Sequence, residues 1–368
     1  MDTTLENLWV GSPHYKAALV AASEFWRGYK TGPWVGFDAV SAQYSLQDQQ
    51  FLESSLAKLS DSREFKDFFE QIEDKDPSYL SIKSAYLYHR SLSTGSAGGK
   101  HRDTASRLLH TLNTLRWIHH FQFDQFIVVN LAAAELTFVE KGVPTIHMKT
   151  IVGKFSTPSP RFAAWCEQVI LYPYWYVPSS IAIGEYLSKI KRNPSWLDQR
   201  NMQVVDNRGR VVDHHQLNWS SFHAGYFPYT IRQSTGCDNA LGVLKFDITT
   251  PYGVYLHDTN SKAAFLNNTR YLSHGCIRLE DPLLLGNKLL KDNLDTTYLQ
   301  SCYKDQKPVY RKLSTPVAVF SVYLPVSYRK PGVLEYHKDT YKLLSSKKLS
   351  IIVGCSKFKN HVGEARKA

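Results

Sequence analysis

The chain has 368 residues, of which 43% are hydrophobic and 13% aromatic, and its formal net charge is +11. This composition is typical of a globular protein of two or three domains and excludes a disordered polyelectrolyte. The positive charge fits an anionic cell-wall polymer. We do not expect nucleic acid as a partner, because neither a basic amphipathic helix nor a nucleic-acid motif accompanies the charge.

The sequence has no stretch that approaches 18 apolar residues, so we expect no integral membrane segment. Its opening residues, MDTTLENLWV, lack the basic and apolar regions of a signal peptide. We therefore expect either a leader that has been removed or export by another route. The five cysteines are widely spaced, unlike those of a zinc ribbon, and their odd number predicts at least one free thiol.

The first 120 residues predict helices. Ser12-Pro13, Ser62 and Asp76-Pro77 each resemble a helix start, and apolar residues recur behind them at helical spacing. The glycine-rich and serine-rich segment 93–99 predicts a flexible break before a last helix. We interpret this part of the chain as a helical scaffold domain.

From Gln125 the apolar period changes to two. Three short β-rich runs follow, with Lys141-Gly142 as a turn between the second and the third. Strand character returns in LGVLKFDI and YGVYLH, and again in the tail segments VAVFSVYLPVSY and KLSIIVG. These runs predict a β-rich domain.

Residues 157–235 interrupt this domain with the aromatic run LYPYWYVPSS, a predicted helix at 180–191 and a predicted hairpin around Asn207–Gly209. We interpret them as an inserted subdomain and predict an α+β fold. The expected domains are a helical scaffold (1–120), a β-rich domain in two parts (121–156 and 236–345), the insertion (157–235) and a C-terminal extension (346–368).

Ser273-His274-Gly275-Cys276 places a cysteine in a short turn between a polar loop and a helix predicted to start at Asp281-Pro282. Such a turn exposes the sulfur. The backbone N–H groups of Gly275 and Cys276 would then form an oxyanion hole, reinforced by amides at the helix start.

A cysteine thiol is only slightly ionised at neutral pH, so a nucleophilic Cys276 needs a base. His274 is so close in sequence that a direct imidazole–sulfur contact is awkward, whereas His257 ends the YGVYLH strand and can approach from outside. We predict His257 as the base, with its ring oriented by the backbone carbonyl or the carboxylate of Asp258. Ser273 and His274 are expected to orient the turn and line the site.

Other interpretations of these residues stay open. Cys276 could be a core cysteine, and His257, His274 and Cys276 could together bind zinc, but the polar motif around the cysteine favours a nucleophile. The pair His214-His215 is interpreted as a surface pair rather than as metal ligands. We therefore predict no metal and no organic cofactor.

His257, followed after fifteen residues by Ser273-His274-Gly275-Cys276 and the apolar Ile277, resembles the signature of the L,D-transpeptidases, whose catalytic domain has the YkuD fold. The wider resemblance covers residues 105–345 and includes FIVVNLAAAELTFVE, PYGVYLHDT and SHGCIRLEDP. Its order is similar to that of the large periplasmic branch, in which a capping insertion splits the catalytic domain. Arg278 stands where many of these families have Asn, and it resembles the form found in the large branch.

The resemblance implies that Cys276 attacks the peptide bond between the third residue of a peptidoglycan stem tetrapeptide and its terminal D-alanine. An amine from another stem, a lipoprotein or a free D-amino acid would resolve the thioester, giving 3-3 crosslinks or an exchanged terminus, whereas water would give carboxypeptidase activity. The protein would serve peptidoglycan synthesis and cell shape in the periplasm or cell envelope. The candidate substrate-binding residues are Arg278, Tyr255, Arg232, Asn239 and Trp175.

Two other functions remain open at this point. An exported antibacterial toxin could use the same chemistry on the wall of a neighbouring cell. A wall-binding protein could keep the fold without catalysis, although the presence of both His257 and Cys276 argues against this.

Overall fold

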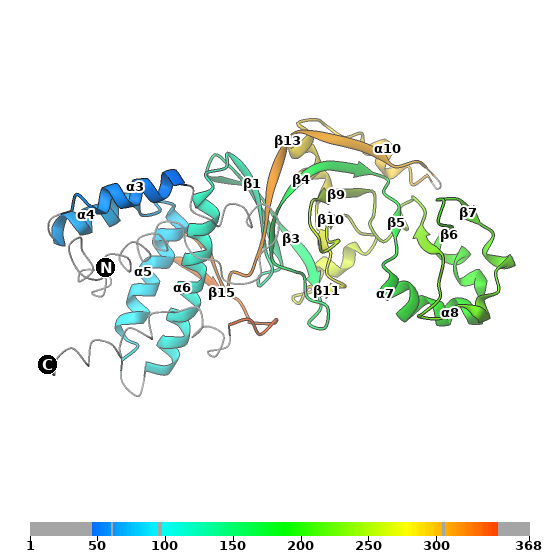
Figure 1. The fold of residues 1–368 in the computed structure, drawn as a ribbon, viewed down its shortest axis with the longest axis horizontal. Coiled ribbons are helices and arrows are strands. Elements are labelled where there is room, and N and C mark those ends of the chain that lie inside the picture. The colour runs from blue at the N-terminus through cyan, green and yellow to red at the C-terminus, as the bar shows by residue number, and fades with distance from the viewer. Residues whose placement is uncertain (1–45, 60–61, 95–97, 304–305, 345–368) are drawn as a thin grey trace. The chain divides into compact units, whose positions relative to one another are not determined.

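The computed structural model describes residues 46–59, 62–94, 98–303 and 306–344, and these form two compact units (Figure 1). The first unit takes in the chain up to Thr145, residues 161–164 and the chain from Ala318. The second takes in residues 146–160 and 165–317. The helix start expected at Ser12-Pro13, the KLSIIVG strand and the extension at 346–368 lie outside the described residues.

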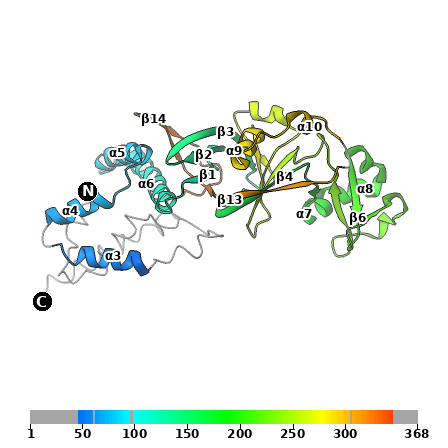
Figure 2. The same cartoon turned by 90° about the horizontal axis from the view of Figure 1, so that it is seen from above.

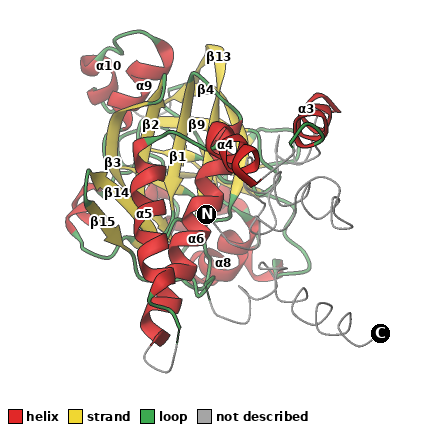
Figure 3. Cartoon of the chain, turned by 90° about the vertical axis from the view of Figure 1, so that its left-hand side faces the viewer, coloured by secondary structure: helices red, strands yellow, loops and turns green. Residues whose placement is uncertain are grey.

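The first unit contains the predicted helices. Asp76 caps α5, because its carboxylate accepts hydrogen bonds from the backbone N–H groups of Ser78 (2.8 Å) and Tyr79 (3.3 Å), and Pro77 occupies the first turn. α5 ends at Ser91 and α6 begins at Gly99, so a break lies between the two helices as predicted, and they lie side by side (Figure 3). The helices are α3 (Leu46–Leu56), α4 (Ser62–Ile72), α5 (Pro77–Ser91) and α6 (Gly99–His120).

Strands pack against these helices within the same unit. Val326 of β14 joins Tyr79 and Ile82 of α5 and Leu108 and Leu112 of α6 in one buried cluster. We had expected the helices to form a scaffold domain of their own. They do not, because the end of the chain supplies part of the surface that buries them. The strands of this unit are β1 (Gln125–Asn130), β2 (Glu135–Glu140), the end of β13 (Val309–Val322), β14 (Val326–Lys330) and β15 (Val333–Tyr336).

The second unit is built on a sheet in the strand order β11-β3-β12-β10-β9-β4. Its inward side chains, among them Ile151, Phe246, Leu256 and Ile277, are fully buried. Helix α9 begins behind the predicted cap, since Asp281 accepts a hydrogen bond from the Leu284 N–H at 2.9 Å. The elements are β3 (Val143–Gly153), β4 (Phe162–Leu171), β9 (Leu244–Ile248), β10 (Leu256–His257), β11 (Tyr271–Ser273), β12 (Ile277–Leu279), α9 (Pro282–Leu290) and α10 (Thr296–Gln300).

An insertion lies between β4 and β9, and its helices and strands lie together in Figure 2. Its four-stranded sheet has the order β5-β8-β6-β7, and its own core includes Ile190, Leu197, Val204 and Ile231. The elements are β5 (Trp175–Tyr176), α7 (Ser179–Ile181), the π-helical η2 (Ala182–Tyr186), α8 (Leu187–Arg192), β6 (Met202–Val205), β7 (Val211–Val212), β8 (Thr230–Gln233) and the short 3₁₀ turns η3 (Pro194–Trp196), η4 (Asp198–Arg200), η5 (His214–Gln216) and η6 (Trp219–Ser221).

The insertion starts later than the sequence suggested. Residues 157–171 had been assigned to it, but β4 pairs with β9 from Cys166↔Ile248 to Leu171↔Leu244 and so belongs to the main sheet. The predicted helical segment at 180–191 and the hairpin around Asn207–Gly209 are both confirmed. The architecture as a whole is α+β.

A disulfide joins Cys237 to Cys302, with the two Cα atoms 4.9 Å apart. Within the described part of the chain, Cys166 and Cys276 are free thiols, the first buried and the second partly exposed. The expectation of at least one free thiol is therefore confirmed. None of the helices in the described segments has both the length and the apolar character needed to cross a membrane.

Candidate active site

The turn that carries Cys276 connects two short strands of the main sheet. β11 runs parallel to the end of β3, with Ser273 opposite Gly153. β12 pairs with β3 on one side and runs parallel to β10 on the other, where His257 stands opposite Arg278. The sheet register thus brings the two predicted catalytic segments together. We had predicted that the helix start at Asp281 lies next to Cys276. It does not, because the turn leads into the strand β12.

Two serines fix the shape of this turn. Ser273 Oγ accepts a hydrogen bond from the Gly275 N–H (3.1 Å) and donates one to the Cys276 carbonyl (2.5 Å). Ser159 Oγ donates to the Gly275 carbonyl (2.7 Å) and accepts from the Gly153 N–H (2.9 Å). Gly275 has a φ of +126°, a conformation that favours glycine. The role predicted for Ser273 in orienting the turn agrees with these bonds.

The same bonds correct the predicted oxyanion hole. The Gly275 N–H donates to Ser273 Oγ and is therefore engaged inside the turn. Of the two amides proposed from the sequence, Cys276 remains the candidate donor. Gly275 contributes through its conformation rather than through its N–H group.

Cys276 is a partly exposed thiol, and its surroundings shift its pKa in opposite directions. Burial raises its pKa, and this is the largest effect. The backbone N–H and the hydroxyl of Tyr255 oppose it by stabilising the thiolate, as do the charges of Lys245 and Arg278. The thiol is therefore protonated at rest, with groups around it that favour negative charge once it develops.

His257 is buried and neutral. Its Nδ1 is hydrogen-bonded to the backbone carbonyl of Asp258, which can only accept, so Nδ1 carries the proton and Nε2 keeps its lone pair. Burial, followed by the charges of Arg278, Lys245 and Lys262, lowers the pKa of His257 to about 3. The ring is thus held in the tautomer that a general base needs.

The Asp258 carboxylate has a different role. Its Oδ2 accepts from the Val243 N–H (3.0 Å), and its Oδ1 lies 2.5 Å from Lys262 Nζ. A Cβ at Gly242 would lie 2.2 Å from the same carboxylate, so that position requires glycine. Of the two orienting groups proposed for His257, the structure therefore selects the backbone carbonyl of Asp258, and its carboxylate stabilises the β9–β10 segment.

Tyr255 connects the two predicted catalytic residues. Its ring lies edge-on to the His257 ring, with centroids 5.6 Å apart, and its hydroxyl interacts with the Cys276 thiol and with the side chain of Trp175. Burial and the nearby thiol raise the pKa of Tyr255. From the sequence, we expected Tyr255 only to bind substrate. The alternation of Tyr255 and His257 along an extended segment was the signal that both side chains share one face.

Lys245 is a site residue that the sequence did not indicate. It stands opposite His257 in the β9–β10 pairing, and its Nζ lies 4.4 Å from the centroid of the Tyr255 ring. It also forms an ion pair with Asp247 at 3.0 Å. Lys245 could be assigned to the site only once the register of β9 against β10 was known, and no local sequence signal gives that register.

His274 connects the turn to the insertion. Its Nε2 lies 3.0 Å from Glu185 Oε1 in η2 and 3.3 Å from Lys154 Nζ. The ring is exposed and engaged with these charged groups. The sequence argument that His274 is not the base agrees with this placement.

The five candidate substrate-binding residues are not brought together. Tyr255 and Trp175 interact at the site, and the charge of Arg278 acts on both Cys276 and His257. The Arg278 Nε is buried without a hydrogen-bond partner among the described residues. Arg232 packs inside the insertion. Its guanidinium carbon lies 4.1 Å from the centroid of the Tyr174 ring, and its Nε donates a hydrogen bond to Gln203 Oε1 at 2.8 Å.

Asn239 is the clear misassignment. Its side chain is fully buried, its Nδ2 donates to the carbonyls of Pro173 (3.1 Å) and Ser234 (2.8 Å), and its Oδ1 accepts from the Leu241 N–H (2.7 Å). These bonds use the polar atoms of the amide to hold the loop before β9. Asn239 is therefore a structural residue rather than a substrate ligand.

His257, His274 and Cys276 do not form a metal-binding group in the described part of the chain. A group of possible metal ligands does occur in the insertion, at Asp198, His214 and His215. It shares no residue with the site around Cys276.

Comparisons with known proteins agree with this geometry. A family model described as the L,D-transpeptidase catalytic domain (YkuD) matches residues 124–319, which include both His257 and Cys276. A Haemophilus influenzae protein named "Putative L,D-transpeptidase" is 34% identical over 170 residues, which are 46% of this chain and 34% of that protein. The chain thus matches only about a third of the length of this curated relative.

Solved structures of the same kind share less sequence. An L,D-transpeptidase from Mycobacterium smegmatis is 16% identical with a TM-score of 0.26, covering 54% of this chain and 58% of that one. The catalytic domain of the Enterococcus faecium L,D-transpeptidase acylated by ertapenem is 13% identical with a TM-score of 0.25, covering 50% and 95%.

Proposed function

Because the chain belongs to the YkuD family of L,D-transpeptidase catalytic domains, we propose that it is a cysteine acyltransferase that acts on peptidoglycan stem peptides. The observation that carries this proposal is the joint placement of Cys276, Tyr255 and His257. A thiol on a constrained turn interacts with a tyrosine whose ring packs on a neutral histidine held in one tautomer. This joint placement supports Cys276 as the nucleophile and His257 as its base.

The first step forms an acyl-enzyme. The Cys276 sulfur attacks the carbonyl carbon between the third stem residue and the terminal D-alanine while His257 Nε2 takes the thiol proton. Because burial disfavours both the thiolate and the imidazolium, we place proton transfer and attack in one concerted step. His257 then returns the proton to the departing amine, D-alanine leaves, and a thioester remains on Cys276.

The second step transfers the acyl group. An incoming amine gives a proton to His257 Nε2 and attacks the thioester carbon, and the Cys276 sulfur leaves with that proton. A stem diamino acid as acceptor gives a 3-3 crosslink, a free D-amino acid gives an exchanged terminus, and water gives hydrolysis. Lys245 and Arg278 place positive charge near the Cys276 sulfur, where negative charge develops.

The cell envelope is the proposed location. Peptidoglycan lies there, and the Cys237–Cys302 disulfide is typical of an oxidising compartment such as the periplasm. We propose that the protein contributes to cell-wall synthesis and cell shape in that compartment.

Muropeptide analysis tests the function. Purified sacculi rich in tetrapeptide stems are incubated with the protein or with Cys276→Ser, digested and analysed by mass spectrometry. We expect dimers joined through two third-position residues with the native protein and none with Cys276→Ser. If shortened stems are the only new product, the protein hydrolyses stem peptides instead of crosslinking them. Unchanged sacculi would contradict the proposal.

A further inference from the structure

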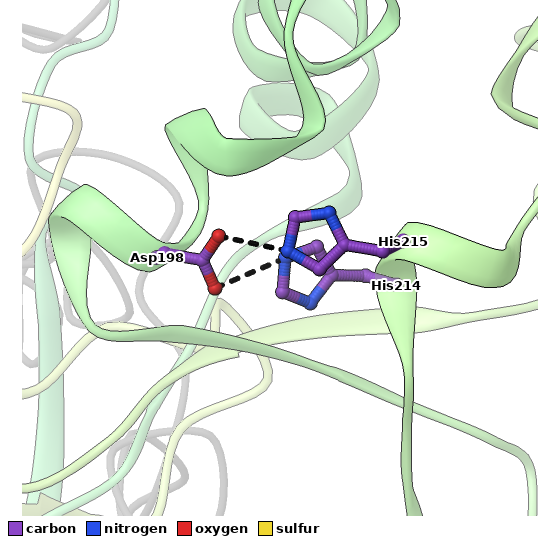
Figure 4. A group of neighbouring side chains, drawn as sticks. All are labelled: Asp198, His214 and His215. Carbon is purple, nitrogen blue, oxygen red and sulfur yellow. Dashed lines mark hydrogen bonds and ion pairs between the residues drawn. The ribbon is translucent and has the colours of Figure 1, made fainter.

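Three side chains of the insertion converge on one point. The carboxylate of Asp198 faces the rings of His214 and His215, and each ring approaches a different carboxylate oxygen (Figure 4). His214 Nε2 lies 3.2 Å from Oδ1, and His215 Nε2 lies 3.0 Å from Oδ2. All three groups offer an atom that can bind a metal ion, and these atoms lie within 4.8 Å of one another.

The backbone holds both histidines in place. Asp213 accepts a hydrogen bond from the His215 N–H at 3.0 Å and so caps the short turn η5. The Trp219 Nε1–H donates to the His214 carbonyl at 2.7 Å, and the Trp219 ring is buried in the core of the insertion. The turn is thus anchored from both sides.

The relative orientation of the two rings is the informative feature. Successive side chains on a helical turn normally diverge, yet the rings of His214 and His215 lie with centroids 4.3 Å apart and planes at 35°. Both Nε2 atoms consequently meet the same carboxylate. One aspartate needs only one such partner for an ordinary surface ion pair, so this pairing of neighbouring rings calls for a different explanation.

We propose that Asp198, His214 and His215 form a zinc site. Zinc binds imidazole nitrogen and carboxylate oxygen at about 2.0–2.2 Å in tetrahedral geometry, which places neighbouring ligand atoms about 3.3 Å apart. The N···O separations of 3.2 Å and 3.0 Å, each to a different oxygen of the Asp198 carboxylate, are close to that spacing. Solvent supplies the fourth ligand, because the side chains of Asp198 and His215 are 51% and 50% exposed.

The site would join two parts of the insertion. Asp198 begins η4, and the histidines lie on η5, which follows the β6–β7 hairpin. An ion bound by Asp198 and by the two histidines links η4 to η5, which are otherwise connected through this hairpin. Zinc therefore stabilises the insertion without taking part in the chemistry at Cys276, and the proposal does not depend on the proposed function.

Calorimetry tests the site directly. The full protein is freed of any purification tag and of metal with EDTA, and is then titrated with zinc chloride. We expect one zinc ion per chain and a higher Tm in zinc than in EDTA. His214→Ala and His215→Ala should each weaken binding by more than about 100-fold, since even residues that only support a metal ligand are worth about 10–100-fold. Asp198→Asn, which preserves the side-chain shape, should also weaken binding and abolish the rise in Tm.

Two matched controls identify the ligands. His223→Ala removes another exposed histidine of the insertion, and Cys276→Ser removes the partly exposed free thiol of the described residues; both variants should bind zinc as the native protein does. Cobalt substituted for zinc should give a tetrahedral visible spectrum without a thiolate charge-transfer band. No binding, binding unchanged in Asp198→Asn and both histidine variants, or binding lost in Cys276→Ser would each overturn the proposal.

Discussion

The ring of Tyr255 lies edge-on to the ring of His257, with centroids 5.6 Å apart and ring planes at 64°. The hydroxyl and the backbone N–H of the same tyrosine interact with the Cys276 thiol. Tyr255 therefore contacts the predicted base through its ring and stabilises the thiolate of the predicted nucleophile through its hydroxyl and its backbone N–H.

Replacing Tyr255 with phenylalanine should make Cys276 less reactive. The hydroxyl favours the thiolate, so its removal should raise the pKa of Cys276 further. A hydrogen bond to a charged group is worth about 1.5–3 kcal/mol, so we expect alkylation of Cys276 by iodoacetamide near neutral pH to slow by about tenfold. Tyr252→Phe changes an exposed tyrosine just before β10 and serves as the control. Identical pH profiles of alkylation in the two variants would contradict this role.

His257 and Cys276 should behave as one unit. The imidazole acts through the sulfur that it deprotonates, so the losses should not add. We expect His257→Ala, Cys276→Ser and the double variant each to lose at least about 10³-fold in turnover on stem peptides. His223→Ala controls for loss of a histidine. If His257→Ala keeps full activity, the base must be another residue, with His274 the next to test.

Stability should fall in acid because His257 is neutral in the folded protein. Its pKa of about 3 lies below the ordinary value of 6.5, so below pH 6.5 the unfolded chain binds a proton that the folded protein does not. This contribution is complete above pH 6.5 and is lost as the pH falls toward 3, by about 1.4 kcal/mol per pH unit.

Urea unfolding between pH 4.5 and 7 measures this slope. His257→Gln keeps a buried polar group but cannot titrate, so the free energy of unfolding of this variant should depend less steeply on pH, whatever its absolute stability. His110, whose pKa burial lowers to about 4, contributes the same kind of slope and stays intact in both proteins. Equal slopes would show that His257 is not held neutral.

Among the cysteines that the structure describes, carbapenems should acylate Cys276 alone. The strained lactam carbonyl meets the same thiol as the peptide bond, and the amine released by ring opening stays tethered, so the adduct should persist. Cys166 is buried, with its pKa raised to about 12, and Cys237 and Cys302 are joined in a disulfide. Intact-protein mass spectrometry should show one added drug mass, and peptide mapping should place it on Cys276. Equal labelling of Cys276→Ser would refute the acyl-transfer interpretation.

The insertion should control the balance between transfer and hydrolysis. We predict that it closes over bound stems and limits the access of water, because Glu185 of η2 pairs with His274 in the turn that carries Cys276. Glu185→Gln breaks this half-exposed pair, which costs at most about 1 kcal/mol of stability. The fraction of hydrolysed products should rise relative to crosslinked ones. Lys191→Gln, at another exposed charge of the same helical segment, should leave the ratio unchanged, and equal ratios in both variants would argue against a cap.

The sequence predicted local features better than it predicted pairing. The cap at Asp76 and the turn at Lys141-Gly142 depend on neighbouring residues, whose chemistry is visible in the sequence. Lys245 and the turn's connection to β12 depend on strand register across the sheet, which short segments do not specify.

The errors have the same physical origin. Asn239 resembled a polar substrate ligand because a sequence does not show whether an amide is satisfied by backbone groups from distant segments. We predicted that the insertion begins at residue 157, because the sequence of β4 resembles other apolar segments. Only its pairing with β9 shows that β4 belongs to the main sheet. The helical scaffold was separated from the strands of the tail because nothing near α5 or α6 indicates that Val326 packs against them.

The Cys237–Cys302 disulfide closes a covalent ring of the backbone, and both His257 and Cys276 lie inside it. A closed loop with a sequence separation of 65 limits the unfolded chain enough to favour folding by about 4 kcal/mol in the chain-entropy estimate. The ring also includes the exposed segment around Leu266, where an envelope protease could cut. After such a cut the piece bearing His257 and the piece bearing Cys276 would stay linked, and they would separate on a denaturing gel only after the disulfide is reduced.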